Sequence, residues 1–354
     1  MPILTDAAEL NPTSSKAASS GPTPQWAQVF QAAMGAGLGG YAYVIALNGK
    51  VIDSGEYGNT RMPEDGAASW STDSRCNLAS VSKTVTATAI MCLIQQQLIM
   101  SVNDCFWPYL QPLLPKVVPA TGVDTVTIGE LLMMISRLKE DGTLYAKPDV
   151  LGFLADYLEN NPIIPGQLYV YSNTNFTILQ AVIESIAKGK GYQSYVDYVN
   201  QEVFKPMGVD KSVFSPVPDP ENQATLAYVN ALDPPYPPGK YWPQMNCVGP
   251  GGWIGSANAV AKYMIGLRTN VPLSAALTEF MQRRQFGWYC GGTPWGLCYH
   301  HNGGLHFQGP AGQPAGSICT GVVSFPFGYD AVLLANKPVD KIIALMIEAF
   351  SAGD

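Results

Sequence analysis

The chain has 354 residues, which at about 150 residues per domain predicts two domains or one large composite domain. Charged residues form 13% of the sequence, about half the share of an ordinary soluble protein, so we expect a largely neutral, polar surface. The net charge of −7 argues against a nucleic-acid partner, because affinity for nucleic acid depends on basic groups that release counterions.

The N-terminal residues 1–24 are rich in Pro, Ser, Ala and Thr without periodicity, and we expect a flexible arm. They lack the basic start and the apolar run of an export signal, which predicts a cytoplasmic protein unless the sequence is a processed form. The uncharged stretch 26–47 is rich in glycine and is interpreted as a helix and then a strand, so no membrane span is expected.

A hairpin is predicted first, because two apolar runs at 41–47 and 50–52 flank Asn48-Gly49. A nearly uncharged helix follows from Ser80 to about Ile99, and its lack of a polar face predicts burial. No convincing strand is expected within 105–225. The remaining expected elements are helices at 127–138, 148–159, 174–188, 256–267 and 338–350, and strands at 286–290, 296–302, 319–325 and 329–336.

This order predicts an α+β fold in which a mainly helical domain is inserted into a sheet domain. We expect the sheet domain to comprise 25–75 and 250–354, and the helical domain to comprise 76–249.

Three patterns favour no cofactor or metal. The G-x-G-x-x-G at 35–40 follows a helix and opens a strand, the reverse of a dinucleotide-binding turn. His300 and His301 would point to opposite faces of a strand, and His306 has no acidic or cysteine ligand spaced beside it. The seven cysteines contain no C-x-x-C pair, which excludes a zinc ribbon and leaves their pairing open; they lie at 76, 92, 105, 247, 290, 298 and 319.

The most informative pattern is Ser80-Val81-Ser82-Lys83. Three residues apart on a helix, the Ser80 hydroxyl and the Lys83 amine share a face, so a buried, neutral lysine can accept the serine proton. At a helix start, free N–H groups also favour a developing oxyanion. Alone, the pattern fits equally a capping serine beside a solvated lysine.

Two later patterns strengthen the first: Tyr171-Ser172-Asn173, and His301-Asn302-Gly303-Gly304. With 77–84, 251–256, 286–288 and 325–336, they make the chain from about 38 to 350 resemble the serine β-lactamase and penicillin-binding-protein superfamily. The branch it resembles is the class C β-lactamase-like one, which includes family VIII carboxylesterases and D-aminopeptidases. The resemblance implies an antiparallel sheet flanked by helices with the inserted helical domain.

The resemblance also implies a role for each matching residue. Ser80 would be the acylated nucleophile, Lys83 its proton acceptor and Tyr171 a proton shuttle. Asn173 would orient Lys83 and the substrate, and His301 stands where true class C lactamases have the lysine of K-T-G. Gly303 would let the substrate backbone approach, and the Gly304 N–H would join the Ser80 N–H as the oxyanion hole.

The chain departs from the family pattern at 133–138, at His300 and at 305–309, so substrate contacts on those edges cannot be transferred. We expect a serine hydrolase of short acyl esters with a small-molecule ester or amide as its partner. A D-amino-acid peptidase, a β-lactamase or an acyltransferase of the same fold stays open, as does a non-catalytic penicillin-binding or sensor protein. Tyr169, Trp288 and Trp295 fit either the pocket wall or the core. The oligomeric state is not predicted.

Overall fold

The computed structural model describes residues 21–146, 149–212, 214–229, 247–308 and 314–353. Its main feature is a seven-stranded sheet in the order β3-β2-β1-β10-β9-β8-β7, in which every neighbouring pair is antiparallel. The strands are β1 (Gly40–Leu47), β2 (Lys50–Arg61), β3 (Ala68–Ser69), β7 (Tyr289–Thr293), β8 (Gly296–Gln308), β9 (Pro314–Ser324) and β10 (Tyr329–Ala335). The chain's first and last strands therefore meet in the middle of one sheet.

The predicted hairpin at Asn48-Gly49 is confirmed. Leu47 pairs with Lys50, and both turn residues have positive φ, 49° at Asn48 and 79° at Gly49. A two-residue turn of this kind needs positive φ at both central positions, which asparagine and glycine tolerate best.

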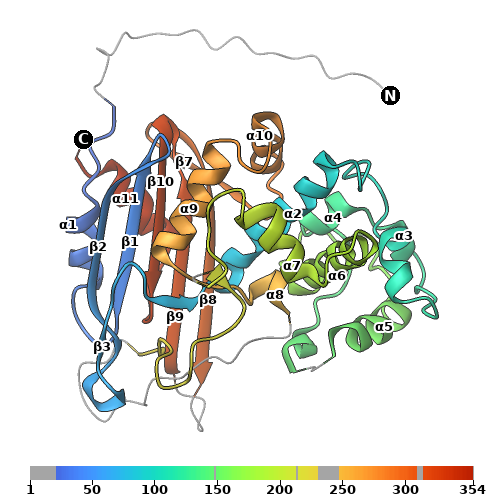
Figure 1. Ribbon diagram of the computed structural model, residues 1–354, viewed down its shortest axis with the longest axis horizontal. Helices are drawn as coiled ribbons and strands as arrows, with labels where there is room; N and C mark the ends of the chain where they lie inside the picture. The colour runs from blue at the N-terminus through green and yellow to red at the C-terminus, as the bar shows by residue number, and fades with distance from the viewer. Residues whose placement is uncertain (1–20, 147–148, 213, 230–246, 309–313, 354) are drawn as a thin grey trace.

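Helices cover both faces of the sheet (Figure 1). On one face, α1 (Trp26–Met34) and α11 (Ile342–Ser351) form a core with Tyr43 and Ile45 of β1. On the other face, α9 (Ala257–Arg268) packs on β1 and β10, and Ala42 and Val44 join the larger core. Successive residues of β1 thus alternate between two apolar cores, which accounts for its almost unbroken apolar sequence.

The helical part is organised around α2 (Ser82–Gln95), in which every residue from Ser82 to Leu93 is buried. This burial confirms the expectation drawn from its uncharged sequence. Around it lie α3 (Trp107–Leu110), α4 (Ile128–Leu132), α5 (Val150–Asn160), α6 (Asn173–Gly189), α7 (Tyr195–Tyr198), α8 (Val248–Gly251) and α10 (Ala275–Arg283). A small sheet of β4 (Arg75–Asn77), β6 (Ile254–Ser256) and β5 (Phe214–Ser215) links this part to the large sheet.

Several predicted elements were wrong in extent. The helix expected over 127–138 ends at Leu132, because Met134 and Arg137 adopt left-handed backbone at φ 57° and 65°. The buried Ser136 side chain accepts from the Leu138 N–H and donates to Asn175 Oδ1, which holds this bend. Helix α10 was not predicted, and β5 lies in a block where no strand was expected.

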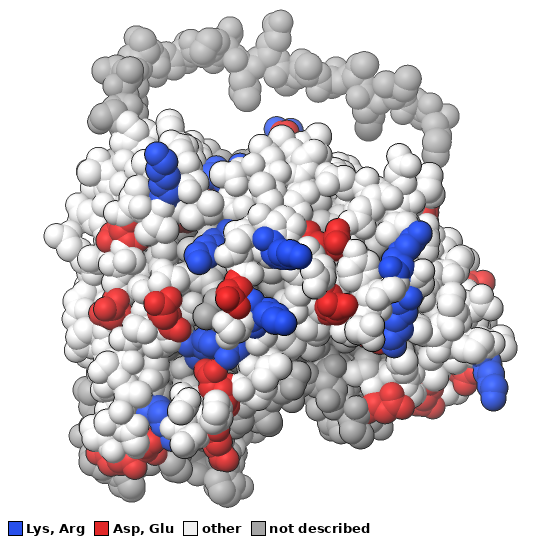
Figure 2. All heavy atoms as spheres, viewed as in Figure 1, with Lys and Arg blue, Asp and Glu red and all other residues white. Residues whose placement is uncertain are grey.

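Among the described residues, no helix is long and apolar enough to cross a membrane. The surface matches the sparse charge of the sequence. On the face drawn in Figure 2, neutral residues cover most of the surface, and some Lys or Arg and Asp or Glu side chains lie next to one another near its middle.

Candidate active site

Ser80 lies in a 3-10 turn, Ala79–Val81, that runs directly into α2. Ala79 has φ 46°, a conformation that costs a non-glycine residue about 1 kcal/mol or more. Two hydrogen bonds hold it: the Ala79 N–H donates to Asn77 Oδ1 at 2.6 Å, and Thr320 Oγ1 donates to the Leu78 carbonyl at 2.8 Å. The strained turn presents Ser80 at the amino end of the buried helix.

The structure brings together the four residues of the first two motifs that were expected to act in catalysis: Ser80, Lys83, Tyr171 and Asn173. Lys83 Nζ lies 3.1 Å from Ser80 Oγ and 2.7 Å from Asn173 Oδ1. The Tyr171 hydroxyl donates to Ser80 Oγ at 2.6 Å. The Ser80 oxygen therefore contacts an amine and a phenol at once, the arrangement that activation of a serine requires.

Lys83 is fully buried, and burial lowers the pKa of its amine to about 7, although the nearby Glu140 carboxylate opposes the shift. Its third contact is the Pro250 carbonyl at 2.6 Å. A neutral amine has two N–H donors and one lone pair. Because Asn173 Oδ1 and the Pro250 carbonyl can only accept, they take both donors, and the lone pair is left facing the Ser80 hydroxyl.

The Tyr171 side chain is 37% exposed at the mouth of the site. Partial desolvation raises the pKa of its phenol to about 12, and the hydrogen bond to Ser80 only partly offsets this. The hydroxyl is therefore protonated at neutral pH, so Tyr171 can give a proton before it takes one.

Asn173 is the first residue of α6, and Ser172 rather than Asn173 caps that helix, because Ser172 Oγ accepts from the Asn175 N–H at 3.1 Å. Glu140 completes the helix start by accepting from Ser172 Oγ and from the Thr174 N–H. With the cap supplied by its neighbours, the Asn173 amide is free to contact Lys83.

The third motif lies on β8. His301 is 1% exposed, and burial together with the nearby Lys83 amine lowers the pKa of its imidazole to about 3. His300 borders a different pocket, against α11, so the two histidines point to opposite faces as expected. Among the described residues there is no group of three His, Cys, Asp or Glu side chains that could hold a metal ion.

The structure explains why position 303 is a glycine, which the sequence alone did not. A Cβ there would lie 2.3 Å from the Leu78 carbonyl oxygen and 2.4 Å from Thr320 Oγ1. The turn before Ser80 therefore packs directly against Gly303, and the approach of a substrate backbone there stays a prediction. Gly304 is exposed on β8, opposite Cys319 of β9. Its role in an oxyanion hole stays a prediction.

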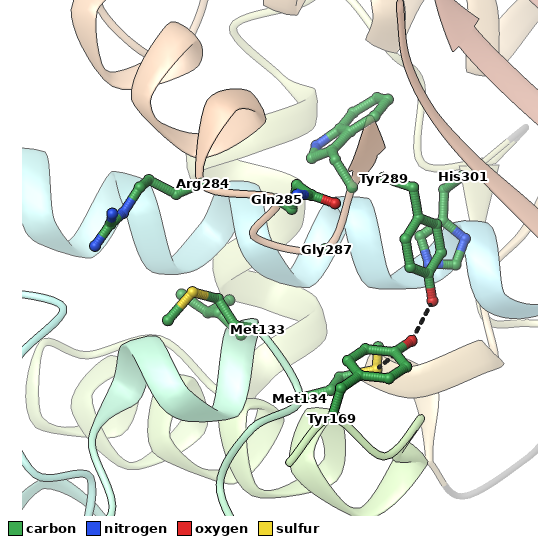
Figure 3. A pocket seen from close by; sticks show the side chains of 10 residues that line it. Met133, Met134, Tyr169, Arg284, Gln285, Gly287, Tyr289 and His301 are labelled. Atoms are coloured by element: carbon green, nitrogen blue, oxygen red, sulfur yellow. Dashed lines mark hydrogen bonds between the residues drawn. The ribbon is translucent and has the colours of Figure 1, made fainter. Parts of the chain in front are cut away.

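His301 also lines a pocket of about 170 Å³, together with Tyr169 and Tyr289 (Figure 3). The Tyr169 and Tyr289 hydroxyls meet across one end of it at 3.0 Å, and the Tyr289 ring packs 5.1 Å from the His301 ring. Trp288 is buried and also lines this pocket, whereas Trp295 packs on the second core, near Phe327.

Sequence reasoning missed the Pro250 carbonyl, Glu140 and Tyr289. A backbone oxygen carries no residue-type signal, and Glu140 and Tyr289 lie outside the three motifs. Only the similarity at 251–256 hinted that the segment beside Pro250 approaches the site.

The family model described as Beta-lactamase matches residues 26–341. The chain belongs to the Beta-lactamase family. Its serine hydrolase fold was therefore identified correctly from the three motifs, including the antiparallel sheet flanked by helices.

Protein flp is a relative of low sequence identity. Protein flp of Staphylococcus aureus (strain NCTC 8325) is 27% identical over 184 residues, 49% of this chain. The chain spans about a third of the length of that curated relative, since the match covers 34% of it.

Two solved structures share the fold at low identity. A D-stereospecific amidohydrolase from Streptomyces sp. is 20% identical with a TM-score of 0.68, covering 92% of this chain and 98% of that one. EstCE1, a hydrolase with promiscuous acyltransferase activity, is 19% identical with a TM-score of 0.68, covering 92% and 97%.

Proposed function

We propose that the protein is a carboxylesterase that cleaves short acyl esters through an acyl-enzyme on Ser80. The observation that carries the proposal is the Lys83 amine, which is buried, about half neutral at pH 7 and oriented by Asn173 and Pro250 toward the Ser80 hydroxyl. A serine with such a partner is a nucleophile without any histidine.

In the proposed reaction, Ser80 Oγ attacks the ester carbonyl while its proton passes to Lys83 Nζ. The Ser80 and Gly304 N–H groups stabilise the oxyanion. When the intermediate collapses, the Tyr171 hydroxyl gives its proton to the departing alkoxide, and Lys83 re-protonates Tyr171. Water then attacks the acyl-enzyme, its proton passes through Tyr171 and Lys83, and Ser80 leaves protonated.

The neutral third motif favours esters over β-lactams. A β-lactam antibiotic carries a carboxylate beside its amide, and a cation at position 301 would anchor it. His301 carries no charge, because burial lowers the pKa of its imidazole to about 3. Esters of uncharged acids need no such anchor, and an alkoxide is a better leaving group than the nitrogen anion that unassisted cleavage of an amide would expel.

The main rivals share the first half-reaction. Amide cleavage is the activity named for the Streptomyces relative in fold, and acyl transfer is named for EstCE1. Neither has an observation in this chain that favours it over ester hydrolysis. A sensor protein that is acylated but not deacylated would differ from an esterase, because it would release one equivalent of alcohol per protein and then stop.

The test combines labelling with turnover. An aryl alkylphosphonate should add one phosphonyl group to the peptide containing Ser80, read by mass spectrometry, and 4-nitrophenyl acetate should be hydrolysed over many turnovers. Ser80→Ala should lose both signals, and Ser82→Ala is the control for loss of a neighbouring hydroxyl at the same helix start. Full esterase activity in Ser80→Ala would refute the assignment, and labelling without turnover would identify a sensor.

A further inference from the structure

Tyr171 belongs to a segment that has no regular structure of its own. Residues 161–172 form neither helix nor strand before α6 begins. Every side chain in 168–171 is at least 36% exposed, so burial does little to fix this part of the chain. The 2.6 Å contact between the Tyr171 hydroxyl and Ser80 Oγ therefore depends on the hydrogen bonds that anchor the segment.

Two of these anchors come from the bend that follows α4. The Val170 N–H donates to the Met134 carbonyl at 3.1 Å, and Ser172 Oγ donates to Glu140 Oε2 at 2.8 Å. Val170 and Ser172 are the residues immediately before and after Tyr171. The bend therefore holds Tyr171 through both of its neighbours in the chain.

The same carboxylate oxygen also fixes Asn173. Besides the Ser172 hydroxyl, Glu140 Oε2 accepts the Thr174 N–H at 3.1 Å. Ser172 and Thr174 flank Asn173, so a single oxygen bridges the two sides of that residue. The Asn173 side chain in turn meets Lys83 Nζ at 2.7 Å.

Glu140 is itself held against the start of α6. Ser136 Oγ donates to Asn175 Oδ1 at 3.0 Å on one side of it, and the Asp141 N–H donates to Thr174 Oγ1 at 3.2 Å on the other. The backbone on both sides of Glu140 is thus tied to the helix that its side chain contacts, which limits where Oε2 can lie.

The charge of Glu140 does not help the base. It raises the pKa of the Lys83 amine, against the effect of burial, and so favours the protonated form that cannot accept the serine proton. A carboxylate with this drawback is useful here for the groups that it holds. Both of its contacts use one acceptor oxygen, which a neutral amide also offers.

We propose that Glu140 is a positioning residue, which fixes the start of α6 so that Tyr171 and Asn173 reach the nucleophile and its base. The inference rests on the proposed function for the reaction that it serves, and it adds a residue from outside the three motifs. Small displacements matter in such a site, because a misplacement of about 1 Å can lower a rate by about 100-fold.

Two substitutions separate position from charge. Glu140→Asp keeps the carboxylate but shortens the side chain by one methylene, whereas Glu140→Gln keeps the length and an acceptor oxygen but removes the charge. Glu140→Asp should react at least about 10-fold more slowly than the wild type, and Glu140→Gln should stay within about 3-fold of it. The reverse order would mean that Glu140 acts through its charge, and it would overturn the proposal.

Two rates are compared at pH 9, where Lys83 is neutral because its pKa is lowered to about 7. The first is the rate constant with which an aryl alkylphosphonate labels Ser80. The second is kcat/KM for 4-nitrophenyl acetate, after subtraction of spontaneous hydrolysis. Labelling of Glu140→Asp should be slow but should still reach one phosphonyl group per protein, since a displaced site reacts completely and a misfolded fraction does not react.

Asp197→Ala is the control for the loss of a carboxylate at a helix start, because Asp197 Oδ2 accepts the Gln193 N–H beside α7 at 2.9 Å. Both rates should stay within about 2-fold of the wild type. A loss in Asp197→Ala equal to that in Glu140→Asp would mean that destabilisation alone slows the reaction, which would overturn the proposal.

Ser172→Ala replaces Glu140→Asp if that variant leaves part of the protein unlabelled. It removes the same hydrogen bond from its other end and should slow labelling by at least about 5-fold, the value of one net hydrogen bond. A wild-type labelling rate in Ser172→Ala would overturn the proposal.

The labelling rate separates this proposal from the esterase. If the wild type is labelled at Ser80 but hydrolyses no ester, the proposed function is refuted, and the labelling rates of the Glu140 variants still decide the role of Glu140. If the wild type and Glu140→Asp hydrolyse esters equally fast, the proposed function stands and the positioning role is refuted.

Discussion

Lys83 meets only neutral oxygens: the Ser80 hydroxyl, the Asn173 amide and the Pro250 carbonyl. None of them carries the negative charge that would hold an ammonium group in a buried position. Glu140 acts from farther away and only raises the pKa of Lys83 against the larger effect of burial. The site therefore provides a neutral base by withholding water from the amine, without a neighbouring cation.

This balance predicts the pH dependence of ester cleavage. The value of kcat/KM for 4-nitrophenyl acetate should rise with pH to a plateau, with a midpoint near 7 where Lys83 loses its proton. The plateau should hold to at least about pH 10, because the pKa of Tyr171 is raised to about 12. Glu140→Gln should move the midpoint to lower pH, since Glu140 favours the charged amine.

His301 cannot account for a change in kcat/KM near pH 7, because the pKa of its imidazole is lowered to about 3. The expected midpoint is therefore assigned to Lys83. A profile that is flat from pH 5 to 9 would contradict a titrating Lys83. So would a midpoint that stays fixed in Glu140→Gln.

Substrate charge supplies a second prediction at the residue scale. His301→Lys should raise the ratio of kcat/KM for a chromogenic cephalosporin to that for an aryl ester by at least about 10-fold, because one new ion pair is worth a charge-assisted hydrogen bond. His300→Lys is the matched control, since residue 300 faces the opposite side of β8. An equal shift in both variants would mean that long-range charge, rather than an anchor at position 301, sets the ratio.

At the scale of elements, the features that could be predicted were those that depend on the types of the residues in one short segment. Asn48-Gly49 specifies its turn, and the uncharged run after Ser80 specifies a buried helix. The bend after Leu132 was not predictable, because Met134 and Arg137 adopt left-handed backbone for which neither residue has a preference. The Pro250 contact was equally hidden, because a carbonyl brought to Lys83 from 167 residues away depends on the completed fold.

Ser80 Oγ contacts Lys83 and Tyr171, and Lys83 Nζ contacts Asn173 and Pro250. All but Pro250 could be named from the sequence, because they belong to motifs that occur in a fixed order. The contact between Ser80 and Lys83 followed from their spacing on a helix, but the contacts of Tyr171 and Asn173 did not, since spacing along the chain does not give the distance between α2 and α6. The same limit applies to Gly303, whose packing against the turn before Ser80 could not be derived from the sequence.

That contact yields a prediction for the packing of β8 against the nucleophile turn. Gly303→Ala should reduce kcat/KM for esters by at least about 10-fold, because its Cβ would lie 2.3 Å from the Leu78 carbonyl and must displace the backbone that holds Ala79 and Ser80. Gly292→Ala on β7 is the control, since a Cβ there meets nothing within 4 Å. Wild-type activity in a folded Gly303→Ala protein would contradict this packing argument.

At the scale of the whole molecule, the site lies where two differently built parts meet. The large sheet contributes β8 with His301 and Gly303, and the helical part contributes α2 and the start of α6 (Figure 1). Charged residues are few, and ion pairs at a protein surface contribute little to stability. Apolar packing around the buried α2 is the main connection between the two parts. Lys83 is the one charged residue in that helix.

Burying Lys83 therefore has a cost in stability that depends on pH. Its pKa falls from 10.5 in the unfolded chain to about 7 in the folded protein, so between these values the unfolded state binds the extra proton. Stability then rises with pH through this window, by up to about 1.4 kcal/mol per pH unit, and the contribution is constant below about pH 6.

Lys83→Met removes this titration and keeps a side chain of similar length. The free energy of unfolding of the wild type minus that of Lys83→Met, from urea titrations, should become more favourable to the wild type as pH rises from 7.5 to 9.5. Subtracting the variant cancels the other groups that titrate in this range, and also any constant penalty from the oxygens that lose their amine partner. Lys188→Met is the control, because that amine is at the surface of α6, where its side chain is 43% exposed. A difference that stays constant from pH 7.5 to 9.5 would show that Lys83 keeps its ordinary pKa in the folded protein, and the neutral base proposed for Ser80 would then be absent.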